Sequence, residues 1–287
     1  MKVIRSLRAM AAWSDELRRE GVTIGLVPTM GALHGGHRAL IRAARLRCDA
    51  LVVSTFVNPT QFGPEDDLTK YPRPISKDRA LCRMEGADVC FEPTAKAMYP
   101  DGFQTTVVLP LIARRWEGEV RPQHFSGVAT VVTKLFGVVR PHIALFGQKD
   151  FQQSALVQQL VEDLNLDVEI VVRPTVREQD GLAMSSRNVY LSPKERIVAT
   201  TLYKSLRAGA DAIRKGITDI VALETMMAQI VKQEPALTID YLAVCDPKTL
   251  EPLSLVSSRA VLLGAVRLGS VRLIDNLLIA APATRPL

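Results

Sequence analysis

The sequence predicts an α/β protein, in which a doubly wound parallel sheet is followed by a smaller α+β domain. Up to residue 172, helix-like stretches with apolar residues three and four apart alternate with short, continuous apolar runs. Continuous apolar runs are typical of parallel strands that helices cover on both faces. After about residue 186 the order changes to two helices followed by three neighbouring strands, which favours an antiparallel sheet.

The first domain is expected to contain five pairs of a helix and a strand. Gly21 and Gly86 end the first and third of these helices, and Pro141 follows the end of the fourth. The expected helices span 6–20, 36–47, 77–85, 128–139 and 151–164, and the expected strands span 22–27, 50–57, 88–91, 143–146 and 168–172.

The second domain is expected to follow the loop 177–192. Gly216 separates its two helices, and turns around Pro247 and Gly269 separate its strands. The helices are expected over 193–215 and 217–233, and the strands over 237–244, 260–267 and 270–279. We therefore predict two domains, 1–186 and 187–287.

Composition narrows the possible function classes. With 47% hydrophobic and 23% charged residues over 287 positions, the chain is expected to be globular rather than disordered. The net charge of +6 without a basic stripe, together with only 5% aromatic residues, disfavours nucleic acid and suits small anionic substrates. The four cysteines lack metal-ligand spacing, and we see neither a signal peptide nor a membrane span. We expect a cytoplasmic protein with reduced thiols, no protein-bound metal site and no membrane partner.

A pair of histidines follows the first predicted strand, in the run VPTMGALHGGH at 27–37. His34 and His37 flank Gly35 and Gly36 where a helix begins, so backbone amides and the helix dipole would face an anion there. Their imidazoles could donate hydrogen bonds to phosphate oxygens in a transition state. A pair of metal ligands and a helix-capping role are the alternatives. The run is neither a Walker A loop nor a GxGxxG motif.

Neutral polar residues end the second predicted strand, in the run FVNPTQF at 56–62. Asn58 and Gln61 suit a hydroxyl or carboxylate of a small substrate. The alternative is a turn without a ligand.

The run GQKDFQQ at 147–153 follows a strand and opens a helix. Lys149 could contact phosphate, and Asp150 could bind a ribose hydroxyl or a cation. A purely structural role is the alternative.

The run DGLAMSSRN at 180–188 carries two hydroxyls and an arginine in a loop that contains a glycine. Such a loop could close over a triphosphate, with Ser185, Ser186 and Arg187 as its clamp. Most serine-rich loops have no such role.

Together these runs resemble the pantothenate synthetase family, the pantoate–β-alanine ligases, which belong to the nucleotidylyltransferase superfamily with the HxGH signature. The resemblance extends over nearly the whole chain and implies a Rossmann-like nucleotide-binding domain. Two positions depart from the family: Gly35 is usually acidic there, and Gln123 is usually glycine. The similar segments are PTMGALHGGH, FVNPTQF, EDDLTKYPR (65–73), MYP (98–100), RPQHFSGVAT (121–130), FGQKDFQQ, and TVR (175–177) through SSRN.

The resemblance implies condensation of (R)-pantoate with β-alanine to pantothenate through an enzyme-bound pantoyl adenylate, with ATP as substrate and Mg²⁺ accompanying the triphosphate. It also implies a homodimer. The implied catalytic residues are His34, His37 (also a proton donor), Lys149, Ser185, Ser186 and Arg187. The implied nucleotide site adds Pro28, Met30, Gly31, Ala32, Leu33, Gly35, Gly36, Gly147, Gln148, Asp150, Val176 and Met184. The implied pantoate site consists of Asn58, Gln61 and Gln153, and Gln61 is also expected to face β-alanine.

Two other functions remain open from the sequence. One is a related adenylyltransferase that transfers AMP to a nucleotide, which would need cations where this chain has Asn58, Gln61 and Gln153. The other is a basic, non-catalytic nucleic-acid-binding protein, whose affinity would fall steeply with salt.

Overall fold

The computed structural model describes residues 1–64 and 66–280, so Glu65 of the similar segment 65–73 lies outside the described residues. It divides into two compact units. The first consists of Met1–Gln148 and Gln152–Pro174, and the second of Lys149–Phe151 and Thr175–Leu287. Residue 186, where we expected the boundary, falls inside the second unit, which the chain first enters at Lys149.

The first unit contains a six-stranded parallel sheet with the order β1-β4-β3-β2-β5-β6, which confirms the predicted doubly wound sheet. The order reverses between β2 and β5, and ligands of open α/β sheets bind at the carboxyl ends of the strands at such a point. Strand β1 was not predicted, because three residues are too few to show a pattern. The strands are β1 (Lys2–Ile4), β2 (Ile24–Thr29), β3 (Ala50–Thr55), β4 (Val89–Phe91), β5 (Ile143–Gly147) and β6 (Glu169–Arg173).

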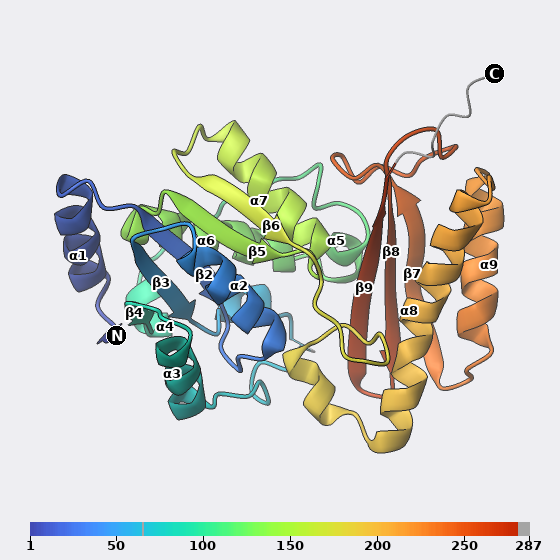
Figure 1. Cartoon of the computed structure of the whole chain (residues 1–287), viewed down its shortest axis with the longest axis horizontal. Helices are drawn as coiled ribbons and strands as arrows, with labels where there is room; N and C mark the ends of the chain where they lie inside the picture. The colour runs from blue at the N-terminus through green and yellow to red at the C-terminus, as the bar shows by residue number, and fades with distance from the viewer. Residues whose placement is uncertain (65, 281–287) are drawn as a thin grey trace. The chain divides into compact units, whose positions relative to one another are not determined.

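Helices cover both faces of this sheet. On one face, Leu40 and Ile41 of α2 and Cys82 of α3 pack with Val27 and Leu51 in a common core, and Figure 1 shows α2 across the front of the strands. Helices α1 and α6 contact each other and β2. The helices are α1 (Leu7–Arg19), α2 (Gly35–Arg45), α3 (Ile75–Met84), α4 (Ala95–Met98), α5 (Glu117–Val120), α6 (His124–Val139) and α7 (Phe151–Asp163), with a 3₁₀ turn η1 (Pro59–Gln61).

Helix α6 begins four residues before its predicted start at 128, because its first turn is polar and lacks the apolar period. A Cβ atom on Gly127 in that turn would lie 2.3 Å from the Thr60 carbonyl oxygen. Glycine therefore permits the close approach of α6 to η1, and this approach positions the residues after β3.

The second unit has an antiparallel sheet, β7-β8-β9, as predicted. Two helices lie side by side against it, α8 on β8 and β9 and α9 on β7 (Figure 1). A Cβ atom on Gly209 of α8 would lie 2.6 Å from Leu262 Cδ2, so this glycine lets α8 pack closely on β8. The elements are η2 (Ser186–Tyr190), α8 (Pro193–Arg214), α9 (Ile220–Lys232), β7 (Leu237–Cys245), β8 (Ala260–Leu268) and β9 (Val271–Ile279).

All four cysteines are buried free thiols, as the sequence predicted. Among the described residues, no helix combines the length and the apolarity needed to cross a membrane.

Candidate active site

Three of the segments singled out in the sequence follow adjacent strands of the first unit. Asn58 and Gln61 come after β3, His34 comes after β2, and Gln153 lies in α7 after β5. Because β3, β2 and β5 are parallel neighbours, the segments that follow them begin at one edge of the sheet, next to the point where the strand order reverses. The sheet therefore gathers amide and imidazole side chains at the place where this fold binds ligands.

The turn between β2 and α2 is held in an unusual backbone conformation. Gly31 and Ala32 have φ angles of +81° and +49°. The carboxylate of Asp78, on α3, accepts hydrogen bonds from the amides of Ala32 (2.9 Å) and Leu33 (2.8 Å). Burial raises the pKa of Asp78, and the hydrogen bonds from these two amides oppose the rise. Sequence reasoning missed this residue, because nothing local links position 78 to a turn 46 residues earlier.

The two histidines cap α2 with their own rings. His34 Nδ1 accepts a hydrogen bond from the Gly36 amide (3.2 Å), and His37 Nδ1 accepts one from the His34 amide (3.3 Å). A ring nitrogen that accepts an N–H carries no proton, so the proton of each neutral ring is on Nε2. The ring centroids lie 4.1 Å apart. The helix-capping role, which we listed as an alternative, is therefore present, and Nε2 is the ring nitrogen that takes no part in it.

Glycine is required between these histidines. A Cβ atom on Gly36 would lie 2.9 Å from Cε1 of His34, and the ring could not keep its place.

After β3, Asn58 is buried and uses its whole amide within the protein. Its Nδ2 donates to Gln61 Oε1 (2.9 Å) and to the Gly127 carbonyl (3.1 Å). Its Oδ1 accepts from the hydroxyls of Tyr99 (2.8 Å) and Thr60 (3.0 Å). Asn58 thus orients Gln61, and it has no remaining hydrogen-bonding atom for a substrate.

Gln61 differs from Asn58 in this respect. Its Oε1 is held by Asn58, and its backbone carbonyl contacts His124 Nδ1 (3.0 Å) and accepts from Arg121 (3.2 Å). Its Nε2 has no hydrogen-bond partner among residues 1–64 and 66–280. This amide group therefore remains as an oriented neutral donor. His124 and Arg121 belong to the segment 121–130 similar to the family, but we had assigned them no role.

Two adjacent glutamines of α7 also differ from each other. Gln152 is buried and bonds Glu117 N (3.1 Å), Ile112 O (2.8 Å) and Arg115 O (3.0 Å). Gln153 is half-buried, and its side chain has no hydrogen-bond partner in the described part of the chain.

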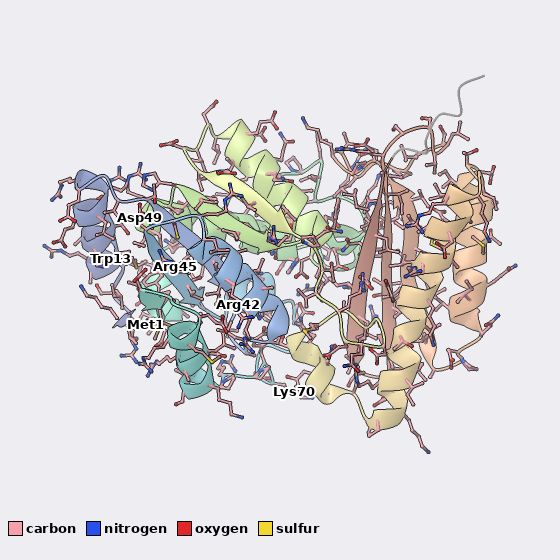
Figure 2. The ribbon with its side chains drawn as sticks, viewed as in Figure 1. Met1, Trp13, Arg42, Arg45, Asp49 and Lys70 are labelled. Carbon is pink, nitrogen blue, oxygen red and sulfur yellow. The ribbon has the colours of Figure 1, made fainter. Side chains whose placement is uncertain are left out.

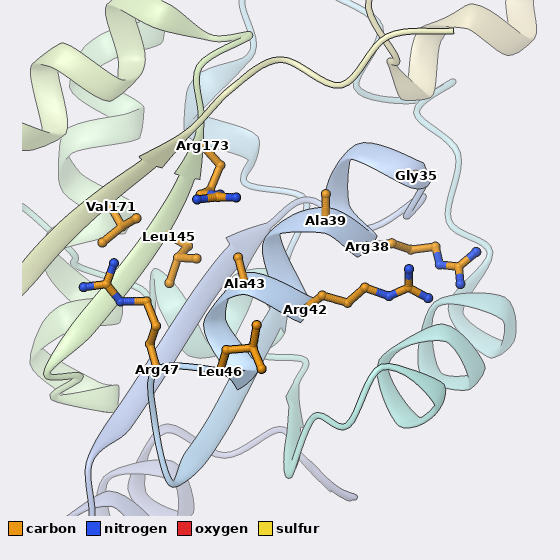
Figure 3. Close-up of a pocket in the computed structure, with 10 residues that line it drawn as sticks. All are labelled: Gly35, Arg38, Ala39, Arg42, Ala43, Leu46, Arg47, Leu145, Val171 and Arg173. Atoms are coloured by element: carbon orange, nitrogen blue, oxygen red, sulfur yellow. The ribbon is translucent and has the colours of Figure 1, made fainter. Parts of the chain in front are cut away.

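An open pocket of about 580 Å³ runs along α2 in the first unit, from Gly35 to Arg47 (Figure 3). Leu145 and Val171 form its floor, and Arg173 at the end of β6 reaches across it. Arg38 and Arg42 extend to the other side of α2, where both pair with Glu85. Arg45, which Figure 2 labels on the same helix, pairs with Asp88 at 2.7 Å. Of the predicted nucleotide-binding residues only Gly35 lines this pocket.

The second unit holds the cationic segments. Lys149 Nζ lies 3.4 Å from Asp150 Oδ1, and the Lys149 side chain is 21% exposed. Met184 N donates to Val176 O (3.0 Å), and Ser185 Oγ accepts from Arg187 N (3.3 Å) at the start of η2. Lys149 and the Ser-Ser-Arg loop therefore belong to the same compact unit, although the sequence separates them by more than thirty residues.

Within the described residues, no group of three or more His, Cys, Asp or Glu side chains could hold a metal ion.

Comparison with known proteins identifies the family. A sequence model of the family described as pantoate-beta-alanine ligase matches residues 2–278. The pantothenate synthetase of Heliobacterium modesticaldum is 48% identical over 279 residues, which cover 97% of this chain and 99% of that protein. The chain belongs to the pantoate–β-alanine ligase family. The pantothenate synthetase of Geobacter sulfurreducens is similarly related, with 49% identity over 276 residues, 96% of this chain and 98% of its own.

Solved structures agree with this assignment. A crystal structure of pantothenate synthetase from Thermus thermophilus has a TM-score of 0.91 and 45% identity, and covers 96% of this chain and 99% of that one. The pantoate-beta-alanine ligase of Francisella tularensis, in a complex with beta-gamma ATP and beta-alanine, has a TM-score of 0.81 and 34% identity over 97% of both chains. The protein is thus a pantoate–β-alanine ligase, which catalyses the ATP-dependent condensation of pantoate with β-alanine. Family membership favours the predicted ligase over both alternatives.

The two departures from the family pattern fit the fold. Gly35 is the first residue of α2, a position at which glycine is acceptable. Gln123 has φ of −92° and ψ of −10°, which any residue can adopt, so glycine is not needed before His124.

Proposed function

We propose that this ligase works in two half-reactions through an enzyme-bound pantoyl adenylate. In the first, a carboxylate oxygen of pantoate attacks the α-phosphorus of ATP, a carboxyl–phosphate bond forms, and pyrophosphate leaves. In the second, the amine of β-alanine attacks the acyl carbon, an amide bond forms, AMP leaves, and the amine loses a proton. No covalent bond to the enzyme is needed, because positioning and charge neutralisation suffice for phosphoryl transfer.

The observation that carries the proposal is the capping arrangement of His34 and His37. Their Nδ1 atoms accept backbone amides at the N-terminus of α2, beside the point where the strand order reverses, and these hydrogen bonds fix the orientation of both rings. Two fixed donors at a helix N-terminus suit phosphate oxygens that gain charge in the transition state. The family resemblance also implies that His37 is a proton donor, a role that requires the imidazolium form, because a neutral ring that gave up its single N–H would become an imidazolate.

The positive charges come from the Lys149 segment and the Ser-Ser-Arg loop. Lys149 and Arg187 bind the triphosphate, together with the hydroxyls of Ser185 and Ser186. The nucleotide contacts come from Pro28, from residues 30–37 and 147–150, and from Val176 and Met184. Gly147 leaves room for the nucleotide to approach the backbone closely, because the nearest side chain that a Cβ atom there would meet is Leu40, at 4.0 Å.

Pantoate binds through neutral donors. Gln61 Nε2 and the amide of Gln153 orient its hydroxyl and carboxylate oxygens, and Gln61 also faces β-alanine. A neutral donor leaves the carboxylate nucleophilic, whereas a buried arginine would lower its reactivity. Asn58 contributes by holding Gln61.

Mg²⁺ bound with the triphosphate would neutralise charge on the phosphate oxygens. Asp150 offers one carboxylate near Lys149 and could supply a single ligand. We also propose a cytoplasmic homodimer: the buried free thiols suit a reducing compartment, and the family resemblance implies the dimer. Analytical ultracentrifugation tests the dimer, with a single monomeric species as the contrary result.

The central test separates the half-reactions. The enzyme is incubated at high concentration with ATP, Mg²⁺ and pantoate, and pyrophosphate is measured before and after β-alanine is added. We expect a burst of about one pyrophosphate per active site before β-alanine, and steady turnover after it. Pyrophosphate release that begins only with β-alanine would contradict the adenylate intermediate.

A further inference from the structure

Two adjacent polar residues lie in the last strand of the antiparallel sheet. Asp275 and Asn276 of β9 are only 5% and 1% exposed. Burying polar side chains is unfavourable unless they are hydrogen-bonded. The hydrogen-bond partners of these two side chains therefore show which segments β9 holds in place.

Asn276 holds the Lys149 segment. Its Nδ2 donates a 2.9 Å hydrogen bond to the backbone carbonyl oxygen of Lys149, which lies 127 residues earlier in the sequence. Lys149–Phe151 belongs to the second unit, although the residues on both sides of it belong to the first. The amide of Asn276 thus attaches the backbone of a catalytic lysine to β9.

Asp275 holds the loop that carries the serines and Arg187. Its two oxygens accept hydrogen bonds from both terminal nitrogens of Arg177, at 2.6 and 2.9 Å. This bidentate, charge-assisted geometry is the strongest and most directional that an arginine makes. Arg177 also donates to the carbonyl oxygens of Gly181 (3.1 Å) and Asn276 (3.3 Å), and its guanidinium lies 3.9 Å from the ring centroid of Tyr203.

Backbone hydrogen bonds connect Arg177 to the part of the loop that carries the serines. Arg177 pairs with Ala183 in an antiparallel bridge, and Met184 N donates to Val176 O at 3.0 Å. Residues 176–184 therefore form a narrow hairpin whose second arm leads directly into Ser185. A displacement of Arg177 would move Ser185 and Arg187 with it.

We propose that Asp275 and Asn276 are positioning residues for the adenylation half-reaction, because they attach to one strand the two segments that carry Lys149 and Arg187. The inference rests on the proposed role of these two cations. In this role the two residues act through their hold on the backbone of the two segments. Misplacement of a catalytic group by about 1 Å can cost about 10²-fold in rate, so such a hold has catalytic consequences.

The first test is a double-mutant cycle on single-turnover pyrophosphate release. Asn276→Asp keeps the shape of the side chain, and in its ionised form it cannot donate to the Lys149 carbonyl. We expect adenylation to slow about tenfold or more, with ligation of supplied pantoyl adenylate reduced less than about threefold. Combined with Lys149→Ala, the substitution should add little to the effect of Lys149→Ala alone, since the group it positions is gone. The inference is overturned if the double variant slows adenylation by the product of the two single effects, or if Asn276→Asp leaves adenylation unchanged.

The same cycle separates this inference from the proposed function. If Lys149→Ala adenylates normally, the role of Lys149 fails and the inference fails with it. If Lys149→Ala is crippled while Asn276→Asp is normal, only the inference fails. Should Asn276→Asp not fold, Asn276→Ala gives the same cycle without a second buried carboxylate.

A matched control distinguishes positioning from general loosening. Ser205 of α8 is fully buried and also donates one side-chain hydrogen bond to a backbone carbonyl, that of Met227 at 2.9 Å. Ser205→Ala should lower the urea midpoint of unfolding and leave the ratio of the two half-reactions unchanged. If it slows adenylation as selectively as Asn276→Asp, the positioning role is wrong.

The second arm is tested with Arg177→Lys, which retains a positive charge beside Asp275 but cannot span both carboxylate oxygens and the Gly181 carbonyl. We expect about tenfold slower adenylation, and little further loss when it is combined with Arg187→Ala. If Arg177→Lys adenylates at the rate of the parent enzyme, the positioning role of Asp275 is wrong.

Discussion

The neighbouring glutamines of α7 offer the sharpest test of the pantoate site. Gln153→Ala removes a half-buried amide that has no hydrogen-bond partner among the described residues. The substitution strands no group in the free enzyme, so we expect the free energy of unfolding to change by no more than about 0.5 kcal/mol. In the complex, however, one or two hydrogen bonds to pantoate are lost.

Each lost hydrogen bond costs about 0.5–1.5 kcal/mol, or about 1–3 kcal/mol if a buried partner is left unpaired. We therefore expect the KM for pantoate to rise about tenfold or more, with ATP binding near normal. Initial rates at varied pantoate and a calorimetric titration with ATP measure the two quantities. An analogue that lacks one pantoate hydroxyl should bind less well to the parent enzyme and lose less in the variant.

Gln152→Ala is the matched control, with the same chemical change one residue earlier. It removes three hydrogen bonds to Ile112, Arg115 and Glu117, so we expect the free energy of unfolding to fall by about 2–4 kcal/mol. The KM for pantoate should change less than in Gln153→Ala. If Gln153→Ala instead weakens the binding of ATP and leaves the KM for pantoate unchanged, the proposed pantoate site has been assigned to the wrong ligand.

Three further predictions concern charge. His37→Ala or Arg187→Ala should slow adenylation by about 10²–10³-fold and spare ligation of supplied pantoyl adenylate, as single-turnover assays would show; equal losses in both half-reactions would refute this division. Lys149→Ala should slow adenylation about 10²-fold, and Lys149→Arg should restore little, since a planar fork does not replace a compact charge; full activity of the arginine variant would contradict this reason. The hydrogen bond from Arg42 lowers the pKa of Glu85, and burial partly opposes this effect. The stability that Glu85 contributes is therefore fully present above its unfolded pKa of about 4.3, and it is lost as the pH falls through the folded pKa. Urea midpoints between pH 6 and pH 3 should therefore fall less steeply in Glu85→Gln, and parallel curves would be the contrary result.

The fold was predictable because its signals are local. Strands such as Ala50–Thr55 are short, continuous apolar runs, and the helices between them show the helical period. The parts that were missed lack such signals. Strand β1 has three residues, and Glu117–Val120 forms one short helix whose place depends on Gln152.

The organisation of the site was less predictable, because it depends on contacts between distant residues. The HGGH run indicated a helix start and an anion site, but the hydrogen bonds from Ala32 and Leu33 to Asp78 connect positions 46 and 45 residues apart. Lys149 directly follows a strand of the first unit in sequence, and its carbonyl is nevertheless held by Asn276 of the second. Periodicity and motif spacing carry no information about such pairs.

The amide side chains show most clearly where sequence reasoning reaches its limit. Asn58 and Gln61 share one motif, Gln152 and Gln153 share another, and all four have the same functional group. In each motif the protein itself bonds one amide completely and leaves a donor of the other unused. Asn58 bonds four neighbours, while Gln61 Nε2 has no hydrogen-bond partner among the described residues. Gln152 bonds three neighbours, while the side chain of Gln153 has no such partner in the described part of the chain. An amide whose donors and acceptor are all bonded within the fold has no hydrogen-bonding capacity for a ligand, whereas an amide with an unused donor keeps that capacity. Hydrogen bonding within the fold therefore gives one member of each pair a structural role and leaves the other as the proposed pantoate contact, and substitutions at the two members of each pair should separate stability from pantoate affinity.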